Sequence, residues 1–286
     1  MGSGFDGGVS RDGFRVRAVD SMSIPHRARC VDLIRQVIGV VTFIAVIVVN
    51  GMAGAGAISG DSIGVIANRY PSYFLPADYV FGIWSLIYLM LFWFTLYQAL
   101  PSNRARPSLQ RVGWWWALNG TLNIAWVTLF SFGAFGLSLL LMFMLLGTLV
   151  VIYRRTGSEH QLTLGERFGV SYPFGLYLSW ICIAFIANAF QYIIYKEWTY
   201  LGLNQPIWSA IMIVAATSLG GVVVRFRGLW IFPLVAAWAV VGIGVRYPEI
   251  PVISLTAWVM AGAGLVAAPL ILQFWARHIP PAGTSP

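Results

Sequence analysis

The residues best suited to binding chemistry are amides and aromatic rings that recur at helical spacing within long apolar segments. One such set, in residues 114–132, has members four, three and four residues apart: Asn119, Asn123, Trp126 and Phe130. This spacing places the four side chains on one face of a helix. A carboxamide buried in hydrocarbon costs free energy unless it is hydrogen-bonded. The face is therefore expected to point toward other helices and away from lipid.

Two further apolar segments repeat the pattern. One places Trp180, Ala184 and Asn188 four residues apart, and the other places Trp84 and Tyr88 one helical turn apart. Together the faces predict a cavity walled by indole rings and edged by amides, suited to a flat, largely apolar ligand with a polar edge. Ring stacking would contribute about 0.5–1.5 kcal/mol per aromatic pair beyond burial. The alternative is that the amides only hydrogen-bond neighbouring helices.

Groups that ordinarily perform catalysis or bind metals are missing from these segments. The deepest charged residue is Asp78, at the mouth of its segment, and the three histidines lie in hydrophilic stretches. Cys30 and Cys182 have no metal-ligand companion. We therefore predict no catalytic residue, no metal site and no required cofactor. A proton-driven pump is disfavoured because the segments lack the carboxylates that form proton relays.

The elements that must position these residues are transmembrane helices. Of 286 residues, 58% are apolar and 10% charged, whereas soluble domains have about 25% charged residues. This composition argues against a soluble enzyme, a disordered chain and, despite a net charge of +8, a nucleic-acid-binding module. Crossing a bilayer takes about 20 apolar residues, which predicts an all-α polytopic membrane protein with eight transmembrane helices. The eight spans are roughly 37–57, 77–100, 114–132, 135–153, 173–195, 206–224, 228–245 and 252–275.

The positive charges predict the orientation of these spans. With a cytoplasmic N-terminus, 15 of the 18 Lys and Arg residues lie on the cytoplasmic side, and only Arg69, Lys196 and Arg246 lie opposite. Eight spans return the C-terminus to the cytoplasm, and the expected location is a bacterial inner (plasma) membrane. Residues 1–36 are expected to form a disordered basic cytoplasmic tail. The three tryptophans at 114–116 are expected to form an interfacial aromatic belt.

Three motifs along the first five spans are similar to those of one family. The first motif begins in the loop before the second span, where the family pattern is P-x-W-x-P-P, followed by seven residues and then W-x-x-L-Y. This chain has Pro71, Tyr73 and Pro76 in the loop part, and Trp84 and Tyr88 in the helix part. The other two motifs read L-N-x-x-W-x-x-L-F at 122–130 and W-x-x-x-A-x-x-x-N at 180–188. The chain therefore resembles the TspO/MBR family of tryptophan-rich sensory and translocator proteins. It departs from the family pattern at Tyr73, which replaces a Trp, and at Leu75, which replaces a Pro.

The resemblance implies a five-helix membrane domain over residues 37–195, with a ligand cavity lidded by the loop that holds Pro71, Tyr73 and Pro76. Family members bind porphyrins, and some bind sterols. Residues 196–286 would add three helices and a short tail without counterpart in that domain. The residues assigned to the ligand by the motifs and the helix faces are Trp84, Tyr88, Asn123, Trp126, Phe130, Trp180, Ala184 and Asn188.

Three functions follow from these expectations. The leading one is a membrane binding or sensory protein that holds a porphyrin or similar flat hydrophobic ligand, with a protoporphyrin-like tetrapyrrole as the candidate. The alternatives are a transporter of a neutral hydrophobic solute and a tryptophan-dependent enzyme that degrades porphyrin. The expected partners are the lipid bilayer and the small hydrophobic ligand. No nucleic acid is expected to bind, and the prediction leaves a homodimer open.

Overall fold

Helices make up the regular structure of the parts of the chain that the structure describes. The computed structural model describes residues 26–156, 162–198, 202–227 and 229–278. Its long helices are α1 (His26–Gly54), α3 (Ile83–Ala99), α5 (Trp115–Ser131), α6 (Phe135–Thr156), α8 (Tyr172–Tyr195), α9 (Gln205–Arg227), α10 (Ile231–Arg246) and α11 (Pro251–His278). The short ones are α2 (Ile63–Ala67), η1 (Asp78–Gly82), η2 (Pro101–Asn103), α4 (Pro107–Val112), α7 (Leu164–Glu166) and the π-helix Arg167–Ser171.

Each of the eight apolar stretches predicted from sequence overlaps one of the long helices, and the second stretch also includes η1. Within the described ranges, four helical segments are long and apolar enough to cross a membrane: Cys30–Gly54, Asp78–Ala99, Phe135–Thr156 and Leu164–Tyr195. Ile231–Arg246 and Pro251–Val266 are shorter apolar helices. Large apolar side chains such as Leu89, Phe143 and Leu255 face outward and are more than half exposed, as expected for surfaces that contact lipid.

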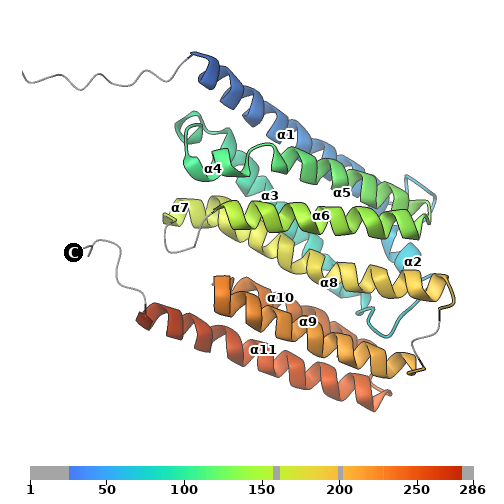
Figure 1. Cartoon of the computed structure of the whole chain (residues 1–286). Coiled ribbons are helices and arrows are strands. Elements are labelled where there is room, and N and C mark those ends of the chain that lie inside the picture. The colour runs from blue at the N-terminus through green and yellow to red at the C-terminus, as the bar shows by residue number, and fades with distance from the viewer. Residues whose placement is uncertain (1–25, 157–161, 199–201, 228, 279–286) are drawn as a thin grey trace, which may run out of the picture.

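The first five long helices form a closed ring. α1 packs on α5, α5 on α6, α6 on α8, α8 on α3 and α3 on α1. α9, α10 and α11 pack together, and this group lies along α8 and contacts η1 through α10 (Figure 1). The chain thus has a five-helix ring and a three-helix group on one side of it.

The N-terminal boundary of α1 differs from the prediction. The expected disordered tail over residues 1–36 is wrong for residues 26–36, which are helical, and residues 1–25 lie outside the described part. Arg35 donates to the carbonyls of Leu109 and Arg104 at 3.3 and 3.1 Å, and Gln36 donates to the carbonyl of Gln98 at 2.6 Å. These contacts hold this part of α1 against the C-terminal end of α3 and the segment after it.

The run of three tryptophans at 114–116 does not act as one belt. Trp114 is 48% exposed, as an interfacial residue would be, but Trp116 is only 3% exposed. The Trp116 indole N–H donates to the carbonyl of Gly39 at 3.0 Å and its ring packs edge-on against Phe94 and Phe174. The belt prediction is therefore wrong for Trp116, because its position on α5 turns the indole into the ring of helices.

α1 and α5 approach each other closely at Gly120. A Cβ atom on Gly120 would overlap Cγ2 of Thr42, so Gly120→Ala is expected to push the helices apart. We expect a loss of about 1–3 kcal/mol in the free energy of unfolding, the usual cost of overpacking. Denaturation of the purified protein in detergent measures it. Gly147→Ala in α6 is the control, since nothing lies within 4 Å of a Cβ there; equal stability of the two variants would contradict the close approach.

Candidate ligand-binding site

Three tryptophans from three helices meet inside the five-helix ring. Trp84 of α3 stacks on Trp126 of α5 with ring centroids 6.0 Å apart and planes 23° from parallel. Trp180 of α8 lies edge-on to Trp84 at 6.3 Å, and Tyr88 stacks on Trp84 at 5.5 Å. The structure therefore brings together the aromatic side chains that the sequence selected on helices α3, α5 and α8.

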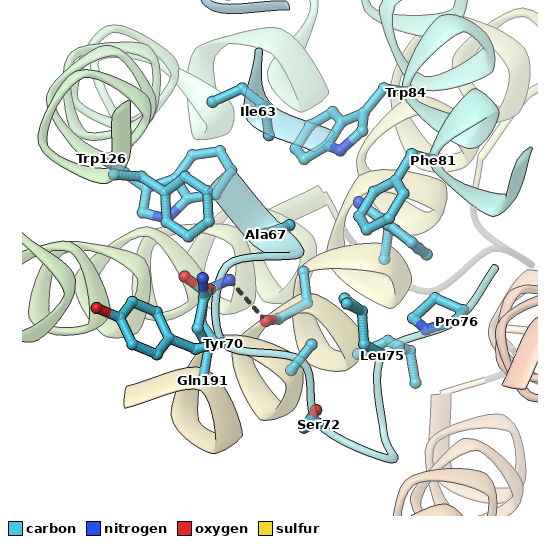
Figure 2. Close-up of a pocket in the computed structure, with 16 residues that line it drawn as sticks. Ile63, Ala67, Tyr70, Ser72, Leu75, Pro76, Phe81, Trp84, Trp126 and Gln191 are labelled. Carbon is cyan, nitrogen blue, oxygen red and sulfur yellow. Dashed lines mark hydrogen bonds between the residues drawn. The ribbon is translucent and has the colours of Figure 1, made fainter. Parts of the chain in front are cut away.

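A small cavity of about 50 Å³ lies beside this cluster, beneath the loop that joins α2 to η1. Figure 2 shows Trp84 and Phe81 on one side of the cavity, Trp126 on the other, and the loop running past from Tyr70 through Ser72 to Leu75 and Pro76. The residues selected from sequence that line it are Trp84, Trp126, Phe130, Trp180, Ala184, Asn188 and Pro76. The loop thus lies over the cavity as a lid would.

A larger cavity of about 900 Å³ adjoins the small one between α1, α2, α3 and α5. Trp84, Tyr88 and Trp126 form its aromatic wall. Its polar edge includes Arg69 and Asp78, whose side chains are 43% and 76% exposed and so give the cavity a charged rim in contact with water. The polar residues that line this cavity are Asn50, Ser62, Asn68, Arg69 and Asp78.

The two cavities share a wall. Ile63, Phe81, Trp84 and Trp126 line both of them. Ile63 belongs to α2 and Phe81 to η1, so the position of these two short elements decides how far the cavities are separated.

Two indole N–H groups in the wall of the small cavity lack acceptors. Trp126 and Trp180 are 5% and 2% exposed, and neither Nε1 has a hydrogen-bond partner among the residues that the structure describes. A buried donor without an acceptor costs about 1–3 kcal/mol. Both side chains line the small cavity, and a ligand atom that accepts from either donor would offset this cost.

The amides of the predicted site have different surroundings. Asn123 is buried at 1% exposure and lies in a hydrogen-bond chain: Asn50 donates to its Oδ1 at 2.7 Å and it donates to the hydroxyl of Tyr177 at 2.8 Å. This chain joins α1, α5 and α8, and Asn123 is absent from the walls of both cavities. Asn188 lines the small cavity and donates to the carbonyl of Ala184 at 3.1 Å. Asn123 therefore hydrogen-bonds neighbouring helices, which was the alternative interpretation of the amides. Asn188 lies at the cavity, as the ligand-site interpretation predicts.

Only one of the three predicted lid residues lines the small cavity. Pro76 lines the small cavity, Pro71 is exposed, and Tyr73 turns away from the cavity to pack edge-on against Tyr247 at 5.1 Å. Leu75, which stands where the family pattern has a Pro, is buried and faces the cavity.

Sequence reasoning missed the contribution of α2. This helix has only five residues, and its Ser62 accepts a hydrogen bond from the backbone N–H of Val65 as an N-cap. Gln191 of α8 fastens it by donating to the carbonyl of Ile66 at 3.0 Å. The N-cap serine is the local sequence signal for this helix. The position of α2 in the site depends on its contact with α8, which the local sequence does not indicate.

Comparison with known proteins identifies one family. A family model described as TSPO-like protein matches residues 36–270, and so covers both the five-helix ring and most of the three-helix group. The match extends beyond residues 37–195, to which the sequence motifs are confined. No curated protein and no solved structure matches the chain.

Proposed function

We propose that this chain, which belongs to the TSPO-like protein family, holds a porphyrin or a similar flat hydrophobic ligand between α3, α5 and α8. It is an integral membrane protein, with helical segments long and apolar enough to cross a bilayer. The observation that carries the proposal is the meeting of Trp84, Trp126 and Trp180 at two adjoining cavities. Such a cluster offers stacking faces to a flat ring system.

The two cavities suggest how the ligand would lie. The larger one, at about 900 Å³, falls in the range of small-molecule sites, which span about 300–1,000 Å³. The smaller one, at about 50 Å³, has room only for a few atoms. We therefore place the ring system in the larger cavity against Trp84 and Tyr88. A substituent with an acceptor atom, such as a carbonyl or carboxylate, would enter the smaller cavity and accept from Trp126 and Trp180.

The proposed membrane arrangement has eight spans with both termini in the cytoplasm of a bacterial cell. In support, α1 begins and α11 ends at the end of the bundle that carries α4 and α7, opposite α2 (Figure 1). The ligand-binding domain would be the five-helix ring over residues 37–195, and residues 196–286 would form the three-helix group. The larger cavity would then open toward the side away from the cytoplasm, where Arg69 lies.

Binding of protoporphyrin IX tests the proposal. Titration of the purified protein in lipid nanodiscs should give saturable quenching of tryptophan fluorescence at one ligand per chain. Nanodiscs without protein are the control for partition into lipid. Quenching that rises without saturation, in parallel with that partition, would contradict the proposal. Movement of the ligand across proteoliposomes would in addition support the transporter alternative.

A further inference from the structure

The segment that closes the small cavity, residues 68–82, is held from the outside by α10 and the residue that follows it. We call this the lid segment. Backbone carbonyls of Ser72, Pro76 and Val80 each accept a hydrogen bond from that direction. The donors are the Tyr247 hydroxyl at 2.8 Å, the Arg246 guanidinium at 3.2 Å and the Trp238 indole at 3.1 Å.

Arg246 makes the most contacts with the lid segment. Besides its bond to Pro76, its Nη2 donates to Oδ1 of Asn68 at 2.6 Å, and its Nη1 lies 3.6 Å from Oδ1 of Asp78. Asn68 in turn donates to the same Asp78 oxygen at 3.2 Å. One guanidinium thus joins the beginning of the lid segment to η1. Hydrogen bonds that involve a charged group are about twice as strong as neutral ones.

The backbones of α10 and the lid segment also come into contact. The N–H of Ala77 donates to the carbonyl of Gly242 at 3.1 Å. A Cβ atom on Gly242 would overlap Cγ2 of Val80 and lie 3.2 Å from Cβ of Pro76. Only a glycine at position 242 therefore permits α10 to approach the lid segment this closely.

The Tyr247 side chain is suited to a lasting contact. Burial raises the pKa of its phenol above the ordinary value, even though Arg246 lowers it. The hydroxyl is therefore protonated near neutral pH and remains a donor to Ser72. The ring packs edge-on against Tyr73 of the lid segment.

The inner surface of the same segment forms part of both cavities. Ser72, Leu75 and Pro76 line the small cavity, and Asn68 and Asp78 line the larger one. Contacts on the outer surface therefore fix the walls on the inner surface. We propose that the C-terminal end of α10, through Arg246 and Tyr247, is a latch that holds the lid segment closed and sets the rate at which a ligand enters and leaves the small cavity. This inference rests on the proposed function for its ligand, but the latch itself can be tested without one.

Hydrogen exchange of the ligand-free protein tests the latch. In Arg246→Met, amides of the lid segment should exchange at least about tenfold faster than in the wild type, because a charged group no longer holds the closed form. Tyr247→Phe removes one hydroxyl and retains the ring, so it should disturb folding less than Arg246→Met does. It should give a smaller increase in the exchange rate of the same lid-segment amides. Arg155→Met is the control: it removes an exposed cation of α6 that contacts Trp115, and neither residue belongs to the lid segment or lines either cavity. Unchanged lid exchange in both latch variants would overturn the proposal.

Ligand kinetics test the link to the cavities. Association and dissociation rate constants for protoporphyrin IX should both rise at least about tenfold in Arg246→Met, while the Kd changes by less than about threefold. Equal rates in the variant and the wild type would overturn the link. If the wild type binds no protoporphyrin, the proposed function fails, whereas the exchange experiment still decides for or against the latch.

Discussion

Replacing Trp84 and Trp180 together with leucine is expected to raise the Kd for protoporphyrin IX by about 30-fold. Trp84 is the centre of the aromatic cluster, in ring contact with Tyr88, Trp126, Tyr177 and Trp180. The lost stacking surface of Trp84 and the lost N–H donor of Trp180, at about 0.5–1.5 kcal/mol each, amount to about 2 kcal/mol, which is about 30-fold in affinity. Equilibrium titration by the absorbance of the porphyrin measures the effect without relying on the remaining tryptophans.

The matched control for this variant removes two tryptophans elsewhere. Trp93 of α3 and Trp258 of α11 are 51% and 50% exposed, so they face away from the cluster. The double variant Trp93→Leu, Trp258→Leu has the same composition and should bind as the wild type does. If the two double variants bind protoporphyrin equally well, the cluster is not the binding site.

Filling the small cavity has the second largest expected effect. Ala184 lines it from α8 together with Trp126 and Trp180, and a phenylalanine there would occupy the cavity. Ala184→Phe is expected to weaken binding at least about tenfold, because an acceptor on the ligand can no longer reach the N–H donors of the two tryptophans. The same titration measures the loss.

Ala184→Gly is the control at the same position. It leaves the cavity open, so the affinity should stay within about threefold of the wild type, although glycine within a helix lowers the free energy of unfolding by about 0.5–1 kcal/mol. Wild-type affinity in Ala184→Phe would show that the ligand does not use the small cavity.

Sequence could predict the helices and the aromatic cluster because both depend on local patterns. Runs of about 20 apolar residues identified the helical segments. Spacing of three and four residues identified the inward faces that carry Trp84, Trp126 and Trp180. These predictions succeed because burying one face of a helix makes its inward-facing residues repeat every three or four positions, and this repeat can be read from the sequence of that helix alone.

The features that sequence missed depend on contacts between distant segments. The helical part of α1 that was expected to be disordered includes Arg35, which bonds to Leu109, 74 residues away. The role of Asn123 is decided by Asn50 and Tyr177 on two other helices. The latch joins residues 170 positions apart, from Arg246 to Pro76. The spacing of residues within one helix cannot identify such pairs, because many different residues elsewhere in the chain could accept a hydrogen bond from the same donor.

Mapping the contact of a photoactivatable protoporphyrin derivative tests the central claim most directly. After irradiation of the protein in nanodiscs, mass spectrometry identifies the residues joined to the ligand. We predict adducts on the walls of the two cavities, in α2, α3, α5 and α8 around Trp84, Trp126 and Trp180. Excess unlabelled protoporphyrin should suppress them. Adducts confined to α9, α10 and α11 or to the outward faces of the helices would contradict a ligand site within the five-helix ring.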